Sequence, residues 1–191
     1  GMFMASNVET GLERLLAHWG LELKKGFVLD LQKQNVAIQQ RAGPFLINNV
    51  VNYPPLPIVT RLSEESPITK EMDQGTFPFV SPISTENVKN LKVEPLALTS
   101  RLSWFKADLM NLAPMSRFDP DPKDPKGPFA VAVTLEGKMS AMFPKAPEGV
   151  AVSSSSAASW LTQSRGTSRV LLVGTSKLLD SRIPSDASNQ V

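Results

Sequence analysis

Residues 128–135, Pro-Phe-Ala-Val-Ala-Val-Thr-Leu, are the stretch of sequence that decides the fold. This stretch predicts the clearest β-strand of the chain, and Glu136-Gly137-Lys138 follows it. A strand with one solvated face alternates apolar and polar residues, whereas a nearly continuous apolar run indicates burial on both faces. Helices packed against a sheet provide such burial. The stretch therefore predicts a strand inside the helix-covered sheet of an α/β domain.

Shorter apolar segments on either side predict the neighbouring strands. Residues 169–174 form a second buried run, and a turn follows at Gly174-Thr175-Ser176. Residues 27–29, 77–80 and 95–100 predict shorter strand pieces, because they combine apolar residues at strand length with flanking turn residues. The strands are thus expected along most of the chain.

Residues 6–19 predict one amphipathic helix. Its apolar residues fall on one stripe with a period of 3.6: Val8, Leu12, Leu15, Leu16 and Trp19. Two capping boxes compete for its start, Ser6 with Glu9 and Thr10 with Glu13. The second start avoids placing Gly11 inside the helix, where glycine is unfavourable. The sequence does not choose between the two starts.

A single helix, ended by Gly20, is too few to cover the predicted sheet. We therefore expect further helices between residues 85 and 112 or beyond the two ends of the chain. On this interpretation residues 1–191 are one soluble α/β domain that is truncated at both ends.

Proline-rich and serine-rich stretches predict the irregular regions. Residues 48–57 are expected to be mostly irregular, because their three prolines remove N–H donors from any strand ladder. Residues 114–128 contain five prolines and three aspartates, which predicts an extended surface loop. Residues 144–168 are rich in Ser, Ala and Pro and predict a mobile insertion.

Composition argues against several classes of function. Lys and Arg number 20 against 18 for Asp and Glu, and the net charge of +2 is too small to favour nucleic-acid binding. The sequence has no Cys and a single His, so it offers no thiolate or multi-histidine metal site and no Cys nucleophile. The longest apolar runs have the length of a strand, whereas a membrane span needs about 20 such residues.

Catalytic constellations are poorly represented. A Ser-His-Asp triad would need His18, which is better explained as a polar residue near the end of the predicted helix. Asp119, Asp121 and Asp124 resemble a calcium-binding cluster, but the intervening prolines and the missing closing Glu favour a solvated acidic loop. We therefore expect no enzymatic activity, no cofactor and no metal, although a hydrolase that uses His18 remains a testable third possibility.

A few residues are candidates for binding. Thr175 and Ser176 follow a predicted strand, and loops at the carboxyl ends of parallel strands bind ligands in α/β sheets. Ordinary turn chemistry is the alternative explanation for both. Trp160, inside the predicted insertion, fits a partner anchor and a core residue equally well, whereas Trp104 fits the core better.

Four stretches in this order and spacing resemble one known family. They are residues 11–23 (GLERLLAHWGLEL) running into 27–30 (FVLD), 68–69 with 76–79 (IT, TFPF), 126–133 with 135–138 (KGPFAVAV, LEGK), and 168–176 (SRVLLVGTS). The set is similar to the GldG-type auxiliary proteins of uncharacterised ABC transport systems, which include the gliding-motility auxiliary component. Their domain is also likened to one in an intraflagellar transport subunit. The family pattern leads us to expect an acidic residue where Thr175 stands.

The resemblance implies a fold, a location and partners. The implied fold is a partial flavodoxin-like or class I glutamine-amidotransferase-like sheet. The implied parent protein is anchored in the inner membrane with this part on the periplasmic side, so that membrane contact comes through the parent and not through this segment. The expected function is a non-enzymatic binding or assembly module of an ABC-type transport or gliding-motility complex, with permease and ATPase subunits as partners. A small-ligand or carbohydrate receptor domain is the alternative.

Overall fold

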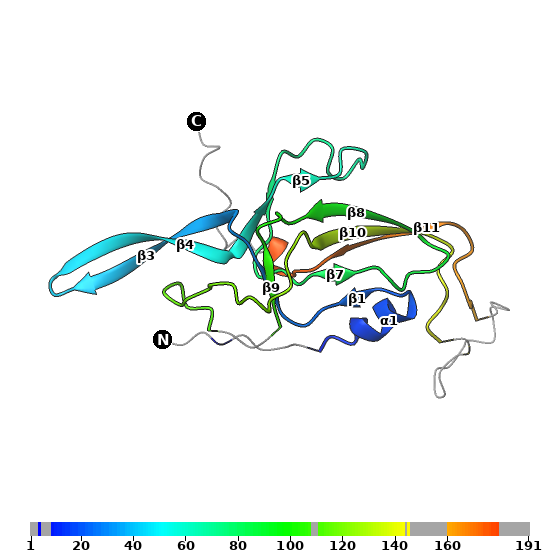
Figure 1. Ribbon diagram of the computed structural model, residues 1–191. Helices are drawn as coiled ribbons and strands as arrows, with labels where there is room; N and C mark the ends of the chain where they lie inside the picture. The colour runs from blue at the N-terminus through cyan, green and yellow to red at the C-terminus, as the bar shows by residue number, and fades with distance from the viewer. Residues whose placement is uncertain (1–3, 5–8, 108–110, 144, 146–159, 180–191) are drawn as a thin grey trace.

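Strands dominate the computed structural model, which describes residues 4, 9–107, 111–143, 145 and 160–179 (Figure 1). Within them, 42% of the chain is strand and only 6% is helix. The helices are α1 (Leu12–His18) and the short 3₁₀ helix η1 (Lys177–Leu179). The strands are β1 (Glu22–Leu23), β2 (Phe27–Leu29), β3 (Lys33–Ala42), β4 (Phe45–Val59), β5 (Arg61–Leu62), β6 (Gly75–Thr76), β7 (Ile83–Ser84), β8 (Lys92–Leu98), β9 (Trp104–Lys106), β10 (Ala130–Gly137) and β11 (Ser168–Val173).

The expectation of an α/β, flavodoxin-like or amidotransferase-like fold is wrong. The described strands form four small sheets, in the orders β1-β7, β11-β10-β8-β5, β2-β9 and β3-β4-β6, and their pairings are antiparallel. Between residues 85 and 112, where helices were expected, the described part of the chain forms β8 and β9. A parallel sheet with helical crossovers is therefore absent from the described residues.

The burial predicted for residues 128–135 is nevertheless present in strand β10. Val131, Val133 and Leu135 have no exposed surface. Val131 lies in a core cluster that side chains of β2, β4, β8 and residues 77–80 complete, while Val133 and Leu135 lie in a second cluster with residues of α1 and β7. Strands and loops thus cover one part of this sheet, and α1 with β7 covers another, because an apolar run specifies burial but not the kind of element that provides it.

The predicted helix exists in a shorter form. Gly11 is its N-cap, in a left-handed conformation, and one half of the Thr10–Glu13 box is present: the Thr10 N–H donates to Glu13 Oε1 at 3.0 Å. The competing start at Ser6 lies outside the described residues. Gly20 ends the helix as predicted, with φ of 84°, and an added Cβ there would lie 2.2 Å from the carbonyl oxygen of Asn87.

The largest error of sequence interpretation concerns residues 48–57, which belong to the long strand β4. Pro54, Pro55 and Pro57 use their carbonyl groups: these accept hydrogen bonds from the N–H groups of Asp30, Phe79 and Phe77 at 3.2, 2.9 and 2.9 Å. Proline removes a donor but keeps its acceptor, so a strand that mainly accepts bonds at this place tolerates it. The segment is therefore regular, and its second half, residues 53–57, is buried.

The hairpin of β3 and β4 projects from the rest of the molecule as a long ribbon, which Figure 1 shows reaching away from the sheets. Its base is fixed by a third core cluster of Leu29, Tyr53, Leu56, Trp104 and Phe118. Tyr53 donates its hydroxyl to the carbonyl of Leu112, and burial raises its pKa to about 12. The ribbon thus has a packed base and an unsupported outer part.

The acidic loop is less solvated than expected. Phe118 is buried in the third core cluster, and Asp124 lies 2.7 Å from the ammonium group of Lys106. Most of the predicted insertion at 144–168 lies outside the described residues. The short strand piece expected at 77–80 is a turn, in which Phe77 and Val80 are buried.

Candidate functional site

The turn after β11 packs tightly against residues 78–81. The Gly174 N–H donates to the carbonyl of Val131 at 2.9 Å, and its own carbonyl accepts from the Ser81 N–H at 2.8 Å. A Cβ at position 174 would lie 2.0 Å from the Ser81 carbonyl oxygen, so only glycine fits this approach. Because β11 runs antiparallel to β10, the turn is not the carboxyl edge of a parallel sheet, which was the reason for singling it out.

Thr175 and Ser176 are adjacent but differ in what their side chains do. The Thr175 hydroxyl donates to the carbonyl of Pro78 at 2.6 Å and accepts from the Lys177 N–H at 3.0 Å. It therefore serves the turn itself. Ser176 is exposed. Ligand binding by either residue stays a prediction.

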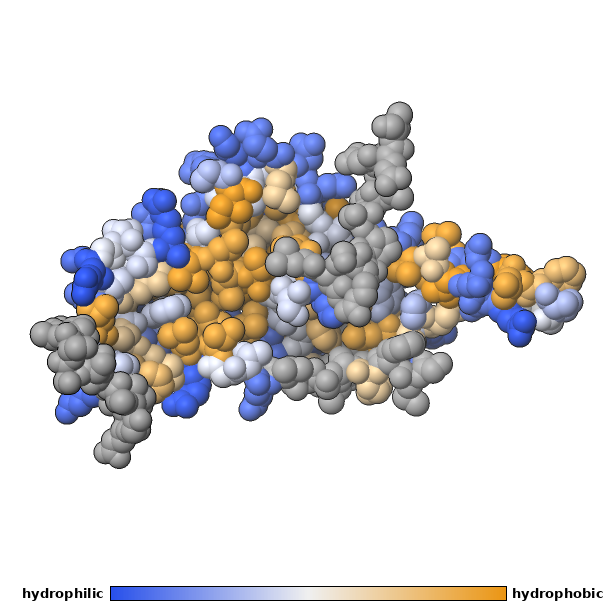
Figure 2. All heavy atoms as spheres, turned by 180° about the vertical axis from the view of Figure 1, so that it is seen from behind, coloured by the Kyte–Doolittle hydropathy of each residue, from blue (hydrophilic) through white to orange (hydrophobic). Residues whose placement is uncertain are grey.

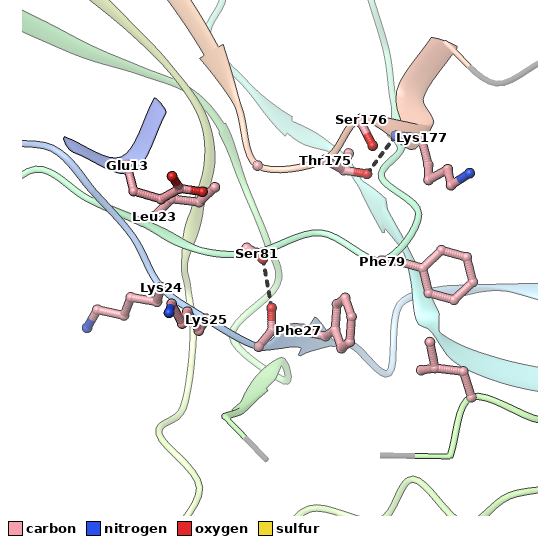
Figure 3. Close-up of a pocket in the computed structure, with 13 residues that line it drawn as sticks. Glu13, Leu23, Lys24, Lys25, Phe27, Phe79, Ser81, Thr175, Ser176 and Lys177 are labelled. Atoms are coloured by element: carbon pink, nitrogen blue, oxygen red, sulfur yellow. Dashed lines mark hydrogen bonds between the residues drawn. The ribbon is translucent and has the colours of Figure 1, made fainter. Parts of the chain in front are cut away.

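Both residues line a cleft of about 470 Å³, here called the lysine cleft (Figure 3). Figure 3 shows Lys24 and Lys25 at one end and the turn of Thr175, Ser176 and Lys177 at the other. The full lining is Glu13, Leu23, Lys24, Lys25, Gly26, Phe27, Phe79, Ser81, Leu112, Gly174, Thr175, Ser176 and Lys177. The cleft thus joins α1, the β1–β2 connection and the turn after β11.

The charge of the lysine cleft is positive, with three lysines against Glu13. Glu13 accepts hydrogen bonds from the Thr10 N–H and hydroxyl, both at 3.0 Å. The bond from the backbone of Thr10 is the main cause of a lowered Glu13 pKa, so this group stays a carboxylate at neutral pH. Lys25 also reaches Glu9, at 3.3 Å, but both side chains are largely exposed and the pair is weak.

The walls of the lysine cleft include apolar side chains from several elements. Phe27 and Phe79 meet edge to face with ring centroids 6.4 Å apart, and Leu23 and Leu112 also line the cleft. Apolar walls with a cationic rim suit a ligand that carries an anionic group on an apolar body. A peptide segment with acidic and apolar residues has this chemistry, and so does an anionic small molecule.

The hydroxyl groups of the lysine cleft are bonded to the backbone. Ser81 Oγ donates to the carbonyl of Gly26 at 2.7 Å, as Thr175 does to that of Pro78. The one histidine of the sequence is not in the cleft: His18 Nε2 lies 2.8 Å from Ser140 Oγ, in a separate depression beside Trp19. A hydroxyl nucleophile needs an adjacent base, and the histidine that could supply one is elsewhere.

The remaining predicted residues lie apart from the lysine cleft. Trp104 is 2% exposed in the third core cluster, which confirms its core role. Trp160 is 40% exposed and donates its ring N–H to the carbonyl of Phe143 at 2.6 Å, so its partner role stays a prediction. The described residues contain no group of three or more His, Cys, Asp or Glu that could hold a metal ion.

Sequence reasoning missed the basic side of the lysine cleft. Lys24 and Lys25 are visible in the sequence only as its longest basic run, and Lys177 stands alone. These residues meet because the β1–β2 connection and the turn after β11 both pack against residues 79–81. The run of two lysines was the one available signal.

The fold and the lysine cleft together define a strand-rich module with a cationic cleft. A family model described as an ABC-type uncharacterized transport system matches residues 1–190, so the chain belongs to this family. The chain is accordingly an auxiliary component of an ABC-type transport system. Neither a curated protein nor a solved structure matches it. None of the helices in the described residues is long and apolar enough to cross a membrane.

Proposed function

We propose that this chain is a non-enzymatic, extracytoplasmic binding or assembly module of an ABC-type transport or gliding-motility complex. Its parent protein would be membrane-anchored and would contact the permease and ATPase subunits. The observation that carries the proposal is the lysine cleft, whose rim is cationic and whose walls are apolar. Such a surface suits an acidic and apolar segment of a partner subunit or of an exported polymer.

The hydrogen bonds of the cleft support binding over catalysis. Ser81 and Thr175 each donate to a backbone carbonyl, and these bonds hold the walls in place. A rigid, preorganised wall lowers the entropic cost of binding a partner segment. Lys24 and Lys25 are exposed and therefore accessible to such a segment.

Affinity purification of the detergent-solubilised full-length protein tests this proposal. We expect an ABC ATPase and a permease to be recovered in stoichiometric amounts with the wild type. Reversing both charges, Lys24→Glu with Lys25→Glu, should reduce their recovery at least tenfold, since each like-charge contact costs on the order of 1 kcal/mol or more. The matched control is Lys70→Glu with Lys123→Glu, which changes the net charge equally at exposed sites outside the cleft.

Two outcomes would contradict the proposal. Recovery of the protein alone, under conditions that keep ABC transporters assembled, would argue against an assembly role. Equal recovery with both double variants would show that the partners bind elsewhere and that the lysine cleft is not the docking surface.

The volume of the lysine cleft favours a second candidate function, that of a small-ligand or carbohydrate receptor. About 470 Å³ falls within the usual size of small-molecule sites. A thermal-shift screen of anionic sugars and nucleotides tests it, because a ligand at a hundred times its dissociation constant adds about 2.7 kcal/mol of stability. Stabilisation that Lys24→Glu with Lys25→Glu abolishes would place this function first.

A further inference from the structure

The outer part of the β3–β4 ribbon, residues 37–50, is held only by its own pairing. Register runs from Ala37 opposite Val50 to Ala42 opposite Phe45. β4 meets β6 only at Ile58 and Val59, close to the body, and no other described strand pairs with residues 37–50. Both backbone edges of this outer part, here called the arm, are therefore open, as Figure 1 shows.

The free end of the arm is apolar on both faces. Phe45 is 71% exposed, Leu46 61% and Ile47 46%. Successive residues of a strand point to opposite faces, so Phe45 and Ile47 lie on one face while Leu46 lies on the other. Figure 2 shows apolar side chains at this end of the ribbon, far from the core.

Charge is scarce along the whole ribbon. Residues 31–60 contain no Asp or Glu, and their charged residues are Lys33 and Arg41. Arg41 stands directly opposite Leu46 and shares its face, so this cation belongs to the apolar end itself. The ribbon is thus neutral except for two cations, one of which is placed at the apolar end.

A belt of amides follows Arg41 toward the body. Gln39 Nε2 donates to Asn48 Oδ1 at 3.4 Å, and Asn49 Nδ2 donates to Gln40 Oε1 at 2.8 Å. These cross-strand bonds hold the register of the ribbon without adding charge. The arm therefore has an apolar end that includes one cation, followed toward the body by a belt of uncharged amides.

An arm with exposed apolar residues and open backbone edges is unfavourable in water alone. An isolated two-stranded ribbon is marginal, and exposed edges are normally protected by charged side chains, which this arm lacks except for Arg41. A shallow groove in a protein covers one face of a ribbon, whereas a lipid surface surrounds an inserted tip on both faces. The second environment suits a tip with exposed apolar residues on both faces.

We propose that the tip of the arm inserts into the interface of a lipid bilayer. Phe45 and Leu46 enter the boundary between headgroups and acyl chains, and Arg41 lies among the lipid phosphates. Insertion stays shallow, because the open backbone edges behind the tip would be unsatisfied in hydrocarbon. This membrane contact goes beyond the proposed transporter docking and involves residues distant from the lysine cleft.

The absence of cysteine from the sequence permits a single-site test. Phe45→Cys carrying a polarity-sensitive fluorophore is mixed with vesicles of phosphatidylcholine, with or without phosphatidylglycerol. We expect a blue shift and a several-fold rise in emission, with quenching by brominated lipids. The matched control is the same label on Leu102→Cys, which replaces an equally exposed leucine (64%) on the body and should respond to neither.

Flotation of unlabelled protein removes the contribution of the dye. We expect Phe45→Ser with Leu46→Ser to lower the bound fraction at least fivefold, while Leu12→Ser with Leu102→Ser, also exposed, leaves it unchanged. Arg41→Gln should weaken binding to anionic vesicles about fivefold and binding to neutral vesicles little, since one cation near such a surface contributes about 1 kcal/mol.

The proposal is overturned if wild-type protein does not float with either vesicle, or if both double variants lose binding equally. It is also overturned if the tip variant abolishes recovery of transporter subunits although vesicles never bind, because the arm would then be a protein-docking element. Vesicles contain no transporter, so failure here is independent of the outcome for the lysine cleft.

Discussion

At the scale of single residues, Gly174 shows how a close backbone approach shapes the candidate site. We predict that Gly174→Ala lowers the free energy of unfolding by about 2 kcal/mol, because the new methyl group would meet the Ser81 carbonyl oxygen at 2.0 Å. Urea denaturation measures the effect. Gly166→Ala is the control: its added Cβ has no atom within 4 Å, and we expect a change of at most about 0.5 kcal/mol. Equal effects of the two substitutions would refute the steric argument.

Asp124 allows a prediction about pH. Partial burial raises the pKa of this carboxyl group, but hydrogen bonds from the Lys106 ammonium and the Asp121 N–H outweigh it, so that the pKa lies below its ordinary value. A lowered pKa means that the bonds stabilise the fold above the unfolded-state pKa and are lost as pH falls through the folded-state value.

We therefore expect Asp124→Asn to destabilise the protein by about 1 kcal/mol at pH 7, a value that allows for partial exposure of the pair. The difference from wild type should shrink at an acidic pH below the ordinary Asp pKa of about 3.9. Urea curves at the two pH values measure it, with Asp119→Asn at an exposed position of the same loop as control. A difference that persists unchanged at low pH would assign the effect to packing and not to charge.

At the scale of elements, the β3–β4 ribbon divides into a structural base and a free arm. We predict that replacing residues 37–50 by Asn-Gly, a two-residue turn that closes antiparallel strands, changes the melting temperature by no more than about 3 °C. The reason is that the arm contributes no side chain to the core clusters, whereas Val36, at the base, packs against the third cluster. Differential scanning calorimetry provides the measurement.

Tyr53→Ala, at the base of the same ribbon, is the contrasting variant. Tyr53 is 5% exposed, meets Phe79 and Phe118 edge to face at centroid distances of 6.2 and 5.4 Å, and bonds to the carbonyl of Leu112. We expect a loss of about 3–5 kcal/mol, the usual range for removing a large buried aromatic side chain. If shortening the arm were equally costly, the arm would be part of the folding core.

The elements also show what sequence patterns can and cannot identify. Strands expected at 27–29 and 169–174 match β2 and β11 within a residue, because a short apolar run flanked by turn residues has few other uses. The long strand β4 escaped prediction because the argument from proline considered lost donors only. Which carbonyl groups accept from Asp30, Phe77 and Phe79 depends on segments that are distant in sequence.

At the scale of the whole molecule, three core clusters hold four small antiparallel sheets together. The central strand β10 contributes to two clusters and thereby links the α1 side of the molecule to the side that carries β2 and β4. The third cluster fixes the base of the ribbon. This organisation places the lysine cleft on the body and the apolar tip on a separate projection, so the two proposed contacts involve different parts of the chain.

The sequence by itself determined the burial of β2 and β10, where α1 ends, and which family the chain resembles. These properties depend on local chemistry: apolar runs and the left-handed freedom of Gly20 are readable along the chain. The burial expected for residues 169–174 is wrong, because β11 is an edge strand with Arg169 and Leu171 exposed. Thr175 and Ser176 were singled out for a reason that antiparallel pairing contradicts, and ligand binding by them stays a prediction.

Only the tertiary structure decided that β10 is covered mainly by strands and loops, with α1 as the one helical contribution from the described residues, that Lys24 and Lys25 share a cleft with Lys177, and that the apolar residues 45–47 remain exposed. Each depends on which segments meet across long separations in sequence. An apolar side chain favours any dry contact, and a proline carbonyl accepts from any well-placed donor, so their partners follow from the packing of the whole chain.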